Sequence, residues 1–168
     1  ASANSINIAR LFPQTFYYFY LYRELKGKGD IVVSVPSGNF GNLTAGLIAK
    51  RMGLPIKRFI ASVNLNDVFK KYLESGEFSP KSSVRTISNA MDVGNPSNFA
   101  RIMELYDFPS LKKDVSGESF SDDDTREAIK ELYDKYQYIA DPHGAVGYLG
   151  LKKFLKDDEI GIFMETAH

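Results

Sequence analysis

Cysteine is absent from the 168-residue chain. The chain therefore forms no disulfide and offers neither a thiolate nucleophile nor a zinc–thiolate site. Proteins without disulfides are typical of reducing compartments, so we expect a cytoplasmic location. The first residues also lack the basic start and apolar middle of a signal peptide.

An excess of charge of either sign is missing as well. Lys plus Arg total 21 and Asp plus Glu total 21, so the formal net charge is zero. Nucleic acids and anionic membrane surfaces attract proteins with a basic excess, and we expect neither as the main partner. No apolar run approaches the roughly 20 residues of a membrane span. The most apolar stretch, residues 16–22, is short and rich in tyrosine.

The composition that remains is that of an ordinary globular domain. Hydrophobic residues make up 43% and charged residues 25% of the chain, close to the average for soluble domains. A chain of this length can bury a substantial core.

Residues 31–50 carry the clearest structural signals of the chain. Residues 31–35 are mostly β-branched and apolar, as in a strand buried on both faces, and Pro36 ends the strand because it has no N–H to donate. Gly38 and Gly41 then form a tight turn that leads into a helix over 41–52. The free N–H groups at the start of such a helix favour a phosphate.

Two features of this turn favour an anion site. Ser37, Asn39 and Asn42 add polar side chains, and no acidic residue lies between Asp30 and Asp67. The alternative is a strand-to-helix turn that needs glycine only for its backbone conformation.

The remaining pattern predicts an α/β protein: a three-layer, open, mostly parallel sheet with helices on both faces. A strand over 58–63 completes a βαβ unit, so it should run parallel to strand 31–35. Ile160 to Met164 reads as the last buried strand. Ligands in such sheets bind beyond the carboxyl ends of the strands, so residues 37–42 and 165–168 are expected to line one crevice.

Helices fill the intervals between these strands. The first covers about 4–26 and is apolar around most of its circumference, so it should be buried or pack between layers. Pro13 should kink or divide it. Further helices are expected over 68–73, from Asn95 or Ser97 to 106, over 121–136 and over 141–155, the first of them capped by an Asn or Asp of 64–67. Residues 84–87 and 138–140 read as short strands, and 107–120 as loop.

Several segments with polar residues allow two interpretations each. Residues 88–98 are rich in turn formers and fit either a surface loop or a binding loop. The acidic triplet 122–124 is explained by the start of a helix, with a metal site as the alternative. His143 fits a structural, capping or catalytic role, and His168 is the last residue. No nucleophile elbow, Walker motif or metal-ligand spacing occurs, so the residues alone support only a ligand with a phosphate.

Six segments together resemble the threonine synthases, pyridoxal-phosphate enzymes of the fold type II, tryptophan synthase β-like group. They are Ser-Ala-Asn-Ser-Ile-Asn-Ile-Ala-Arg at 2–10, Val-Pro-Ser-Gly-Asn-Phe-Gly-Asn at 35–42, Lys-Arg-Phe-Ile-Ala at 57–61, Ser-Asn-Ala-Met-Asp-Val-Gly-Asn-Pro-Ser-Asn at 88–98, Asp-Pro-His-Gly-Ala at 141–145 and Thr-Ala-His at 166–168. They follow the family's order and cover essentially the whole chain.

The resemblance implies a function and a set of site residues. The family converts O-phospho-L-homoserine, a small-molecule substrate, and water to L-threonine and phosphate, as a lyase of amino-acid biosynthesis. It implies that pyridoxal phosphate is bound by Ser37, Gly38, Asn39, Phe40, Gly41, Asn42 and Thr166, the last near the pyridine nitrogen. It implies that the substrate lies near Asn4, Ser5, Asn7 and Arg10.

The sequence departs from the family in one important respect. The Schiff-base lysine of the family lies in a Phe-Lys-Asp type motif before the segment at 2–10, and the chain contains no such motif. We therefore expect residues 1–168 to be an internal part of the large cofactor domain, without the N-terminal domain and the C-terminal remainder. This chain alone should be inactive and have no catalytic residue of its own, and the exposed face around 16–22 should favour self-association. A related phospho-lyase and a non-catalytic phosphate-binding domain are the alternatives.

Overall fold

A computed structural model describes residues 8–165 of the chain as an α/β fold around a parallel four-stranded sheet. The strands are β1 (Asp30–Pro36), β2 (Arg58–Val63), β3 (Val115–Ser119) and β4 (Glu159–Phe163). The helices are α1 (Ile8–Leu25), α2 (Gly41–Arg51), α3 (Val68–Ser75), α4 (Phe99–Leu105), α5 (Phe108–Asp114), α6 (Asp122–Tyr136) and α7 (Pro142–Phe154), with a 3-10 turn, η1 (Asn89–Met91).

The sheet has the strand order β3-β2-β1-β4, and every neighbouring pair is parallel. β1 pairs with β2 from Val32 opposite Arg58 to Pro36 opposite Ser62. A central parallel strand is covered on both faces, which explains why β1 is apolar without alternation and is buried from its second residue onward. The predicted βαβ unit and the fold class are confirmed.

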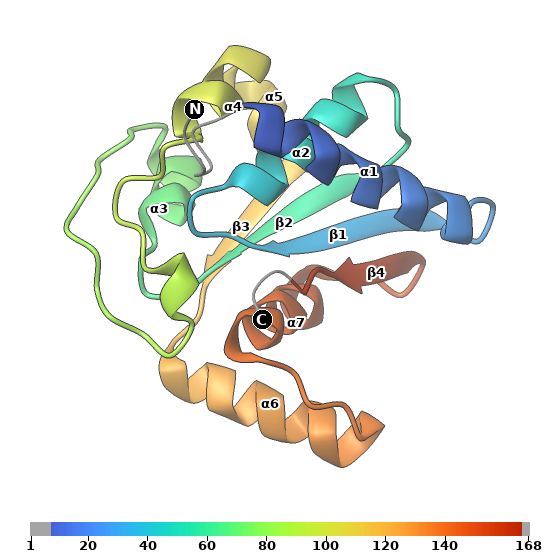
Figure 1. The fold of residues 1–168 in the computed structure, drawn as a ribbon, viewed down its shortest axis with the longest axis vertical. Coiled ribbons are helices and arrows are strands. Elements are labelled where there is room, and N and C mark those ends of the chain that lie inside the picture. Colours follow the sequence, from blue (N-terminus) through green and yellow to red (C-terminus); the bar gives the residue numbers. More distant parts are fainter. Residues whose placement is uncertain (1–7, 166–168) are drawn as a thin grey trace.

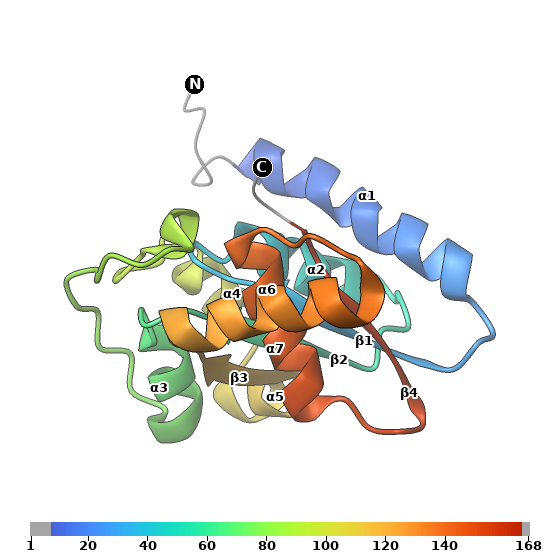
Figure 2. The same cartoon turned by 90° about the horizontal axis from the view of Figure 1, so that it is seen from below.

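Helices cover both faces of the sheet (Figure 1). Val33 and Val35 point into the main core with Tyr18 of α1 and Leu43 of α2. The alternate residues of the sheet point to the other face, where Val32 and Ile60 pack with Leu151 of α7. Figure 2 shows α6 on the outer side of α7. The result is three layers, with α6 added outside the second helical layer.

The helix starts that carry local capping signals agree with the sequence. Ser121 and Asp124 form a reciprocal capping box at α6, and Asp141 accepts hydrogen bonds from the first N–H groups of α7. At α3 the predicted cap is wrong in its chemistry. Asp67 occupies the N-cap position without a side-chain cap bond, because its carboxylate pairs with Lys71 and Lys81. α4 begins after Asn98, not after Asn95 or Ser97.

The loop predicted over 107–120 is wrong, since this segment forms α5 and β3. β3 is a polar edge strand in which only Val115 is buried, so it lacks the apolar run by which a strand is recognised. The strands predicted over 84–87 and 138–140 are also wrong. The N–H of Val84 donates to Asn66 and that of Thr86 to Asp92, so side chains replace a strand partner.

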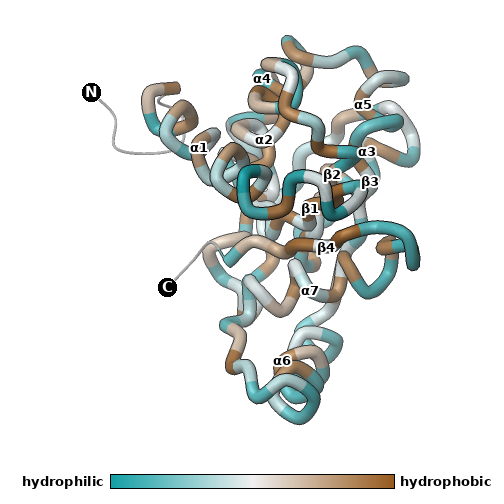
Figure 3. The backbone as a smooth tube through the Cα atoms, turned by 90° about the vertical axis from the view of Figure 1, so that its right-hand side faces the viewer, coloured by the Kyte–Doolittle hydropathy of each residue, from teal (hydrophilic) through white to brown (hydrophobic). Residues whose placement is uncertain are grey.

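Predictions about α1 and β4 require correction. α1 is a continuous helix that passes through Pro13, so the predicted division there is wrong, and the alternative of a kink stays a prediction. It is also a surface helix, because only Leu11, Thr15 and Tyr18 are buried in it. β4, predicted as buried, is only partly covered after Glu159 because it is the edge strand beside β1. Figure 3 shows its hydrophobic character and the hydrophilic segment that precedes it.

No helix within residues 8–165 is long and apolar enough to cross a membrane.

Candidate functional site

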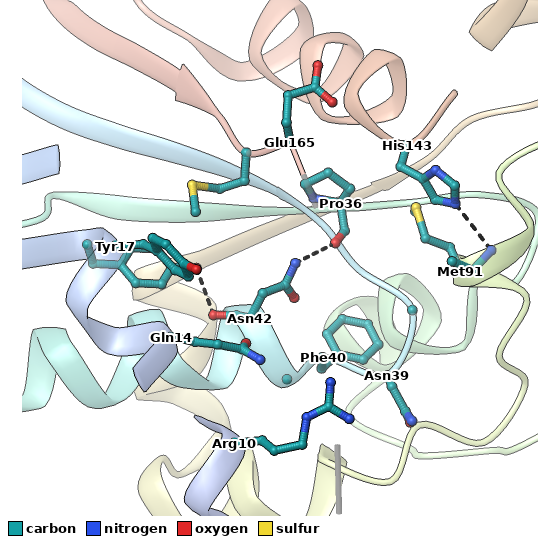
Figure 4. A pocket seen from close by; sticks show the side chains of 15 residues that line it. Arg10, Gln14, Tyr17, Pro36, Asn39, Phe40, Asn42, Met91, His143 and Glu165 are labelled. Carbon is teal, nitrogen blue, oxygen red and sulfur yellow. Dashed lines mark hydrogen bonds between the residues drawn. The ribbon is translucent and has the colours of Figure 1, made fainter. Parts of the chain in front are cut away.

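A cavity of about 700 Å³ opens beyond the carboxyl ends of β1 and β4 (Figure 4). Its walls come from α1, the turn at 38–42, Ala90 and Met91 of the loop after α3, His143 of α7, and the two residues that follow β4. The predicted shared crevice is confirmed for residues 38–42 and Glu165 but not for Ser37, and residues 166–168 lie outside the described part of the chain. This is the position in which open α/β sheets bind ligands.

The turn that enters α2 leaves the start of this helix without a side-chain cap. Phe40 is the N-cap residue, has a left-handed backbone with φ of 61°, and makes no side-chain cap bond. Its ring is buried and packs against Phe69 with centroids 4.5 Å apart, which offsets the cost of this backbone conformation. Within residues 8–165 the N–H groups of Gly41 and Asn42 have no acceptor. They and the positive end of the helix dipole are available to an anion in the cavity.

Gly38 brings the turn into contact with the loop after α3. A Cβ at this position would lie 2.7 Å from Met91 Cα and 3.0 Å from the carbonyl oxygen of Ala90. Both neighbours are backbone atoms that cannot rotate away. The glycine is therefore required by close packing of two chain segments, independently of any ligand.

The polar side chains of the turn hold its shape. Asn39 accepts hydrogen bonds from the N–H and the hydroxyl of Ser97, at 2.7 and 3.0 Å. Asn42 donates to the carbonyl of Pro36 at 2.9 Å and accepts from the N–H of Leu43 at 2.9 Å. The Tyr18 hydroxyl donates to the Asn42 carbonyl at 2.7 Å. Burial raises the pKa of Tyr18, which keeps this hydroxyl a donor.

Ser37 lies beneath the turn and not on the cavity wall. It is 2% exposed, and its hydroxyl donates to the carbonyl of Val35 at 2.8 Å. Its N–H donates to the carbonyl of Ser62 on β2 at 2.9 Å. Ser37 thus fixes the end of β1 against β2.

His143 links the start of α7 to the loop. Its Nε2 accepts from the N–H of Ala90 at 3.2 Å, and its Nδ1 lies 2.8 Å from Asp141. Since Nε2 accepts, the hydrogen-bond network assigns the proton to Nδ1, which donates to the carboxylate. Burial favours the neutral form of Asp141, but hydrogen bonds with Glu165, His143 and helix N–H groups outweigh it and lower the pKa of Asp141.

The charged residues of the cavity are separated. Figure 4 shows Arg10 and Glu165 on opposite sides of the turn, with Arg10 near Phe40 and Glu165 toward α7. The Tyr138 hydroxyl donates to Glu165 at 2.8 Å, and this bond to the carboxylate raises the pKa of Tyr138. An anion is therefore favoured on the Arg10 side of the cavity.

The structure brings together most of the described residues that the sequence predicted for the site. Gly38, Asn39, Phe40, Gly41, Asn42 and Arg10 line the cavity. The predicted residues Asn4, Ser5, Asn7 and Thr166 lie outside residues 8–165. Sequence reasoning missed Gln14 and Tyr17 of α1, and left Ala90 and Met91 between a surface loop and a binding loop. A helical spacing of Arg10, Gln14 and Tyr17 was the available signal, since positions three and four apart share a face.

In the described part of the chain, no group of three or more His, Asp or Glu residues could hold a metal ion. The cavity walls that the structure describes also contain no lysine.

Comparison with known proteins agrees with this geometry. Over 99% of its length the chain is 53% identical to the threonine synthase of Haemophilus influenzae and covers 40% of that protein. A crystal structure of Escherichia coli threonine synthase matches with a TM-score of 0.93 and 46% identity, over 99% of this chain and 40% of that one. A pyridoxal-phosphate-bound threonine synthase from Brucella melitensis matches with a TM-score of 0.93 and 30% identity, over 100% of this chain and 42% of that one.

The chain thus spans about 40% of the length of the curated relatives that it matches. A family model described as "pyridoxal-phosphate dependent enzyme" matches residues 1–162. The chain therefore belongs to the family of pyridoxal-phosphate-dependent enzymes, with the fold type II architecture of its structural neighbours.

Proposed function

We propose that this chain is the part of a threonine synthase that binds the cofactor phosphate. The whole enzyme would act as a carbon–oxygen lyase in the cytoplasm and convert O-phospho-L-homoserine and water to L-threonine and phosphate. The observation that carries the proposal is the start of α2, which has no side-chain cap and whose residues Gly41 and Asn42 line the cavity. The 53% identity to a threonine synthase supports the choice among enzymes of the family.

The residues of the turn fit the phosphate end of the cofactor. Backbone N–H groups at the start of α2 would hold this phosphate, and close packing of Gly38 against Ala90 and Met91 fixes the backbone of the turn that precedes them. Bound pyridoxal phosphate supplies an electron sink for carbanions of amino-acid substrates. Asn39 and Asn42 keep the turn in shape through bonds to Ser97 and Pro36, and Ser37 anchors it from below. The role of Thr166 near the pyridine nitrogen stays a prediction.

Arg10 is the residue we propose for the phosphate of the substrate. It extends from α1 into the cavity beside Phe40, on the side away from Glu165. A guanidinium matches the geometry of a phosphate with two parallel hydrogen bonds. Asn4, Ser5 and Asn7 stay predictions for the same subsite.

The lysine that would carry the cofactor covalently is expected in another segment of the enzyme. Lys57, the one lysine in a segment typical of the family, pairs with Asp30 and Glu159 at the amino ends of the strands, at 2.8 and 3.2 Å. That edge of the sheet is opposite to the cavity. We therefore propose that residues 1–168 belong to a partial cofactor domain and do not turn over substrate alone.

The proposal is tested with the 168-residue chain and with a polypeptide that carries it at the length of its relatives. Both are given O-phosphohomoserine, and phosphate and threonine are measured. We expect equal amounts of the two products from the longer polypeptide and none from the chain alone. Phosphate without threonine would indicate a phospho-lyase. Neither product from a longer polypeptide that binds pyridoxal phosphate would overturn the proposal.

Arg10 gives a sharper test of the substrate subsite. In the active polypeptide, Arg10→Ala should raise the KM for O-phosphohomoserine by about 10- to 100-fold, the effect of losing a hydrogen bond to a charged group. Arg126→Ala is the matched control, because Arg126 pairs with Asp123 on the exposed side of α6. An unchanged KM in Arg10→Ala would remove Arg10 from the subsite.

A further inference from the structure

A buried polar network holds the loop that packs on the phosphate-binding turn. Its centre is Asp92, whose carboxylate accepts from the side chains of Asn64, Asn66 and Thr86 at 2.9, 3.2 and 2.7 Å. The carboxylate also accepts from the N–H of Thr86 at 3.0 Å. Asn64 and Asn66 directly follow β2, so the network ties the loop to the carboxyl end of a core strand.

The donors around Asp92 are themselves fixed. Asn64 is 2% and Asn66 is 4% exposed. The side-chain oxygen of Asn64 accepts from the backbone N–H of Asn66 at 3.0 Å and from its side-chain amide at 2.9 Å. Asn66 in turn pairs with the backbone of Val84 in both directions, at 2.9 and 2.7 Å. A network in which each member is satisfied is rigid, because moving one group leaves several polar atoms unpaired.

The network is adjacent to the cavity wall, because the residue before Asp92 lines the cavity. Met91 precedes Asp92, is 4% exposed, and has the Cα that comes closest to the missing Cβ of Gly38. The N–H of Asp92 donates to the carbonyl of Asn89 at 3.1 Å and closes the 3-10 turn that carries Ala90. Ala90 donates to His143 on the far wall. The loop is therefore held on one side by Asp92 and on the other by His143, with the turn of Gly38 packed between.

We propose that Asp92 is a positioning residue for the cofactor phosphate. Through Ala90 and Met91 it sets the backbone of the turn at Gly38 so that the N–H groups before and at the start of α2 converge on the phosphate. This inference rests on the proposed function for the identity of the ligand. Asp92 does not line the cavity in the described residues and acts only through the loop.

The variant Asp92→Asn has almost the same shape but turns one acceptor oxygen into a donor that faces other donors. Equilibrium dialysis with the whole 168-residue chain measures the dissociation constants of pyridoxal phosphate and of pyridoxal, which lacks the phosphate. In the wild type we expect tighter binding of the phosphorylated form. In Asp92→Asn the ratio of the dissociation constant of pyridoxal to that of pyridoxal phosphate should fall by about tenfold, the effect of weakening one hydrogen bond to a charged group, with pyridoxal affinity unchanged.

A second pair of variants covers the case in which Asp92→Asn does not fold. Thr86→Val removes the hydroxyl that donates to Asp92 at nearly constant shape, whereas Thr86→Ser keeps it. Thr86→Val should lower the ratio and Thr86→Ser should retain it. Amide exchange at residues 38–42 and 90–91, without any ligand, should be faster in Asp92→Asn and Thr86→Val than in the wild type.

The outcomes separate the two proposals. A merely structural role of Asp92 would lower the stability of folded variants and leave both the ratio and the amide exchange of the turn unchanged, which would overturn the positioning role. A wild type that binds pyridoxal and pyridoxal phosphate equally well would overturn the proposed function, and amide exchange would still decide whether Asp92 positions the turn.

Discussion

A single missing Cβ, at Gly38, keeps the turn after β1 in contact with Ala90 and Met91. The next residues of the turn are constrained in other ways. Phe40 holds a left-handed backbone because its ring is buried against Phe69, and Asn42 uses both ends of its side chain within the turn. At the scale of the residue, the site is therefore determined by packing and backbone geometry more than by side chains that would touch a ligand.

Gly38→Ala should weaken pyridoxal phosphate binding and destabilise the fold. The new methyl group meets backbone atoms, so the loop must move, at a cost of about 1–3 kcal/mol typical of overpacking. Affinity for pyridoxal phosphate should fall by at least about tenfold, measured by equilibrium dialysis, with stability from urea unfolding.

Gly117→Ala on β3 is the control for this substitution. Its Cβ would lie 2.8 Å from Cδ1 of Leu73, the flexible tip of a side chain outside the cavity. This variant should lose some stability and retain its affinity for the cofactor. Equal cofactor affinities in the two variants would show that the contact of Gly38 with the loop is unimportant for binding.

Among the elements, α1 has three different sides. Leu11 and Tyr18 are buried against the layer of α2, and Arg10, Gln14 and Tyr17 reach the cavity. The remaining side carries large apolar residues that are exposed, with Phe12 at 55% and Phe16 at 62%. A contiguous apolar surface of this kind favours association with another protein surface.

We predict that the chain self-associates through this side of α1. The double variant Phe12→Glu, Phe16→Glu should be more monomeric than the wild type at the same concentration, because charge opposes burial of the surface. Sedimentation velocity measures the change. Tyr133→Glu, at an aromatic residue of α6 that is 49% exposed, is the control and should not alter association. If the two variants sediment alike, α1 is not the associating surface.

For the molecule as a whole, buried and half-buried glutamates join elements that are distant in sequence. Glu159 of β4 pairs with Lys57 and Arg58, and Glu118 of β3 pairs with Lys70 of α3 and Lys153 of α7. Burial alone would raise the pKa of Glu159, but hydrogen bonds from Arg58, the N–H of Lys156 and Lys57 outweigh it and lower the pKa to about 2. Burial also opposes ionisation of Glu118, yet bonds from Lys153 and Lys70 lower its pKa to about 2.

Stability should therefore fall in acid. A carboxyl group with a lower pKa in the folded than in the unfolded state stabilises fully above its unfolded value, which is 4.5 for these glutamates. The free energy of unfolding, measured by urea denaturation, should decrease as the pH falls from about 4.5 toward 2.

Glu159→Gln tests this pH dependence at a glutamate whose side chain is fully buried. At pH 7 it should cost about 1–3 kcal/mol because Arg58 loses its partner, and the decrease in acid should be smaller than in the wild type. Glu74→Gln, at a carboxylate that is 63% exposed and 3.6 Å from Lys70, should change stability by less than about 0.5 kcal/mol. A pH dependence that is the same in Glu159→Gln and the wild type would contradict this assignment.

The sequence by itself determined the parts whose signals are local. The apolar run before Pro36, the glycines of the turn, and the caps Ser121 and Asp141 each act within a few residues, and β1, α2, α6 and α7 formed where these signals predicted them. The same local pattern predicted an anion site at the turn. Side-chain caps and strand hydrophobicity depend on neighbouring residues only, so they can be read without the fold.

Only the tertiary structure decided which distant segments meet. Asp92 lies in a segment that reads as loop, and its role arises because Asn64 and Asn66 follow a strand beside it. β3 became a strand because β2 offered an unpaired edge to a polar segment. Phe12 and Phe16 of α1 stayed exposed because only one side of this helix met α2. Such contacts depend on packing between residues far apart in the chain, and local propensity contains no information about them.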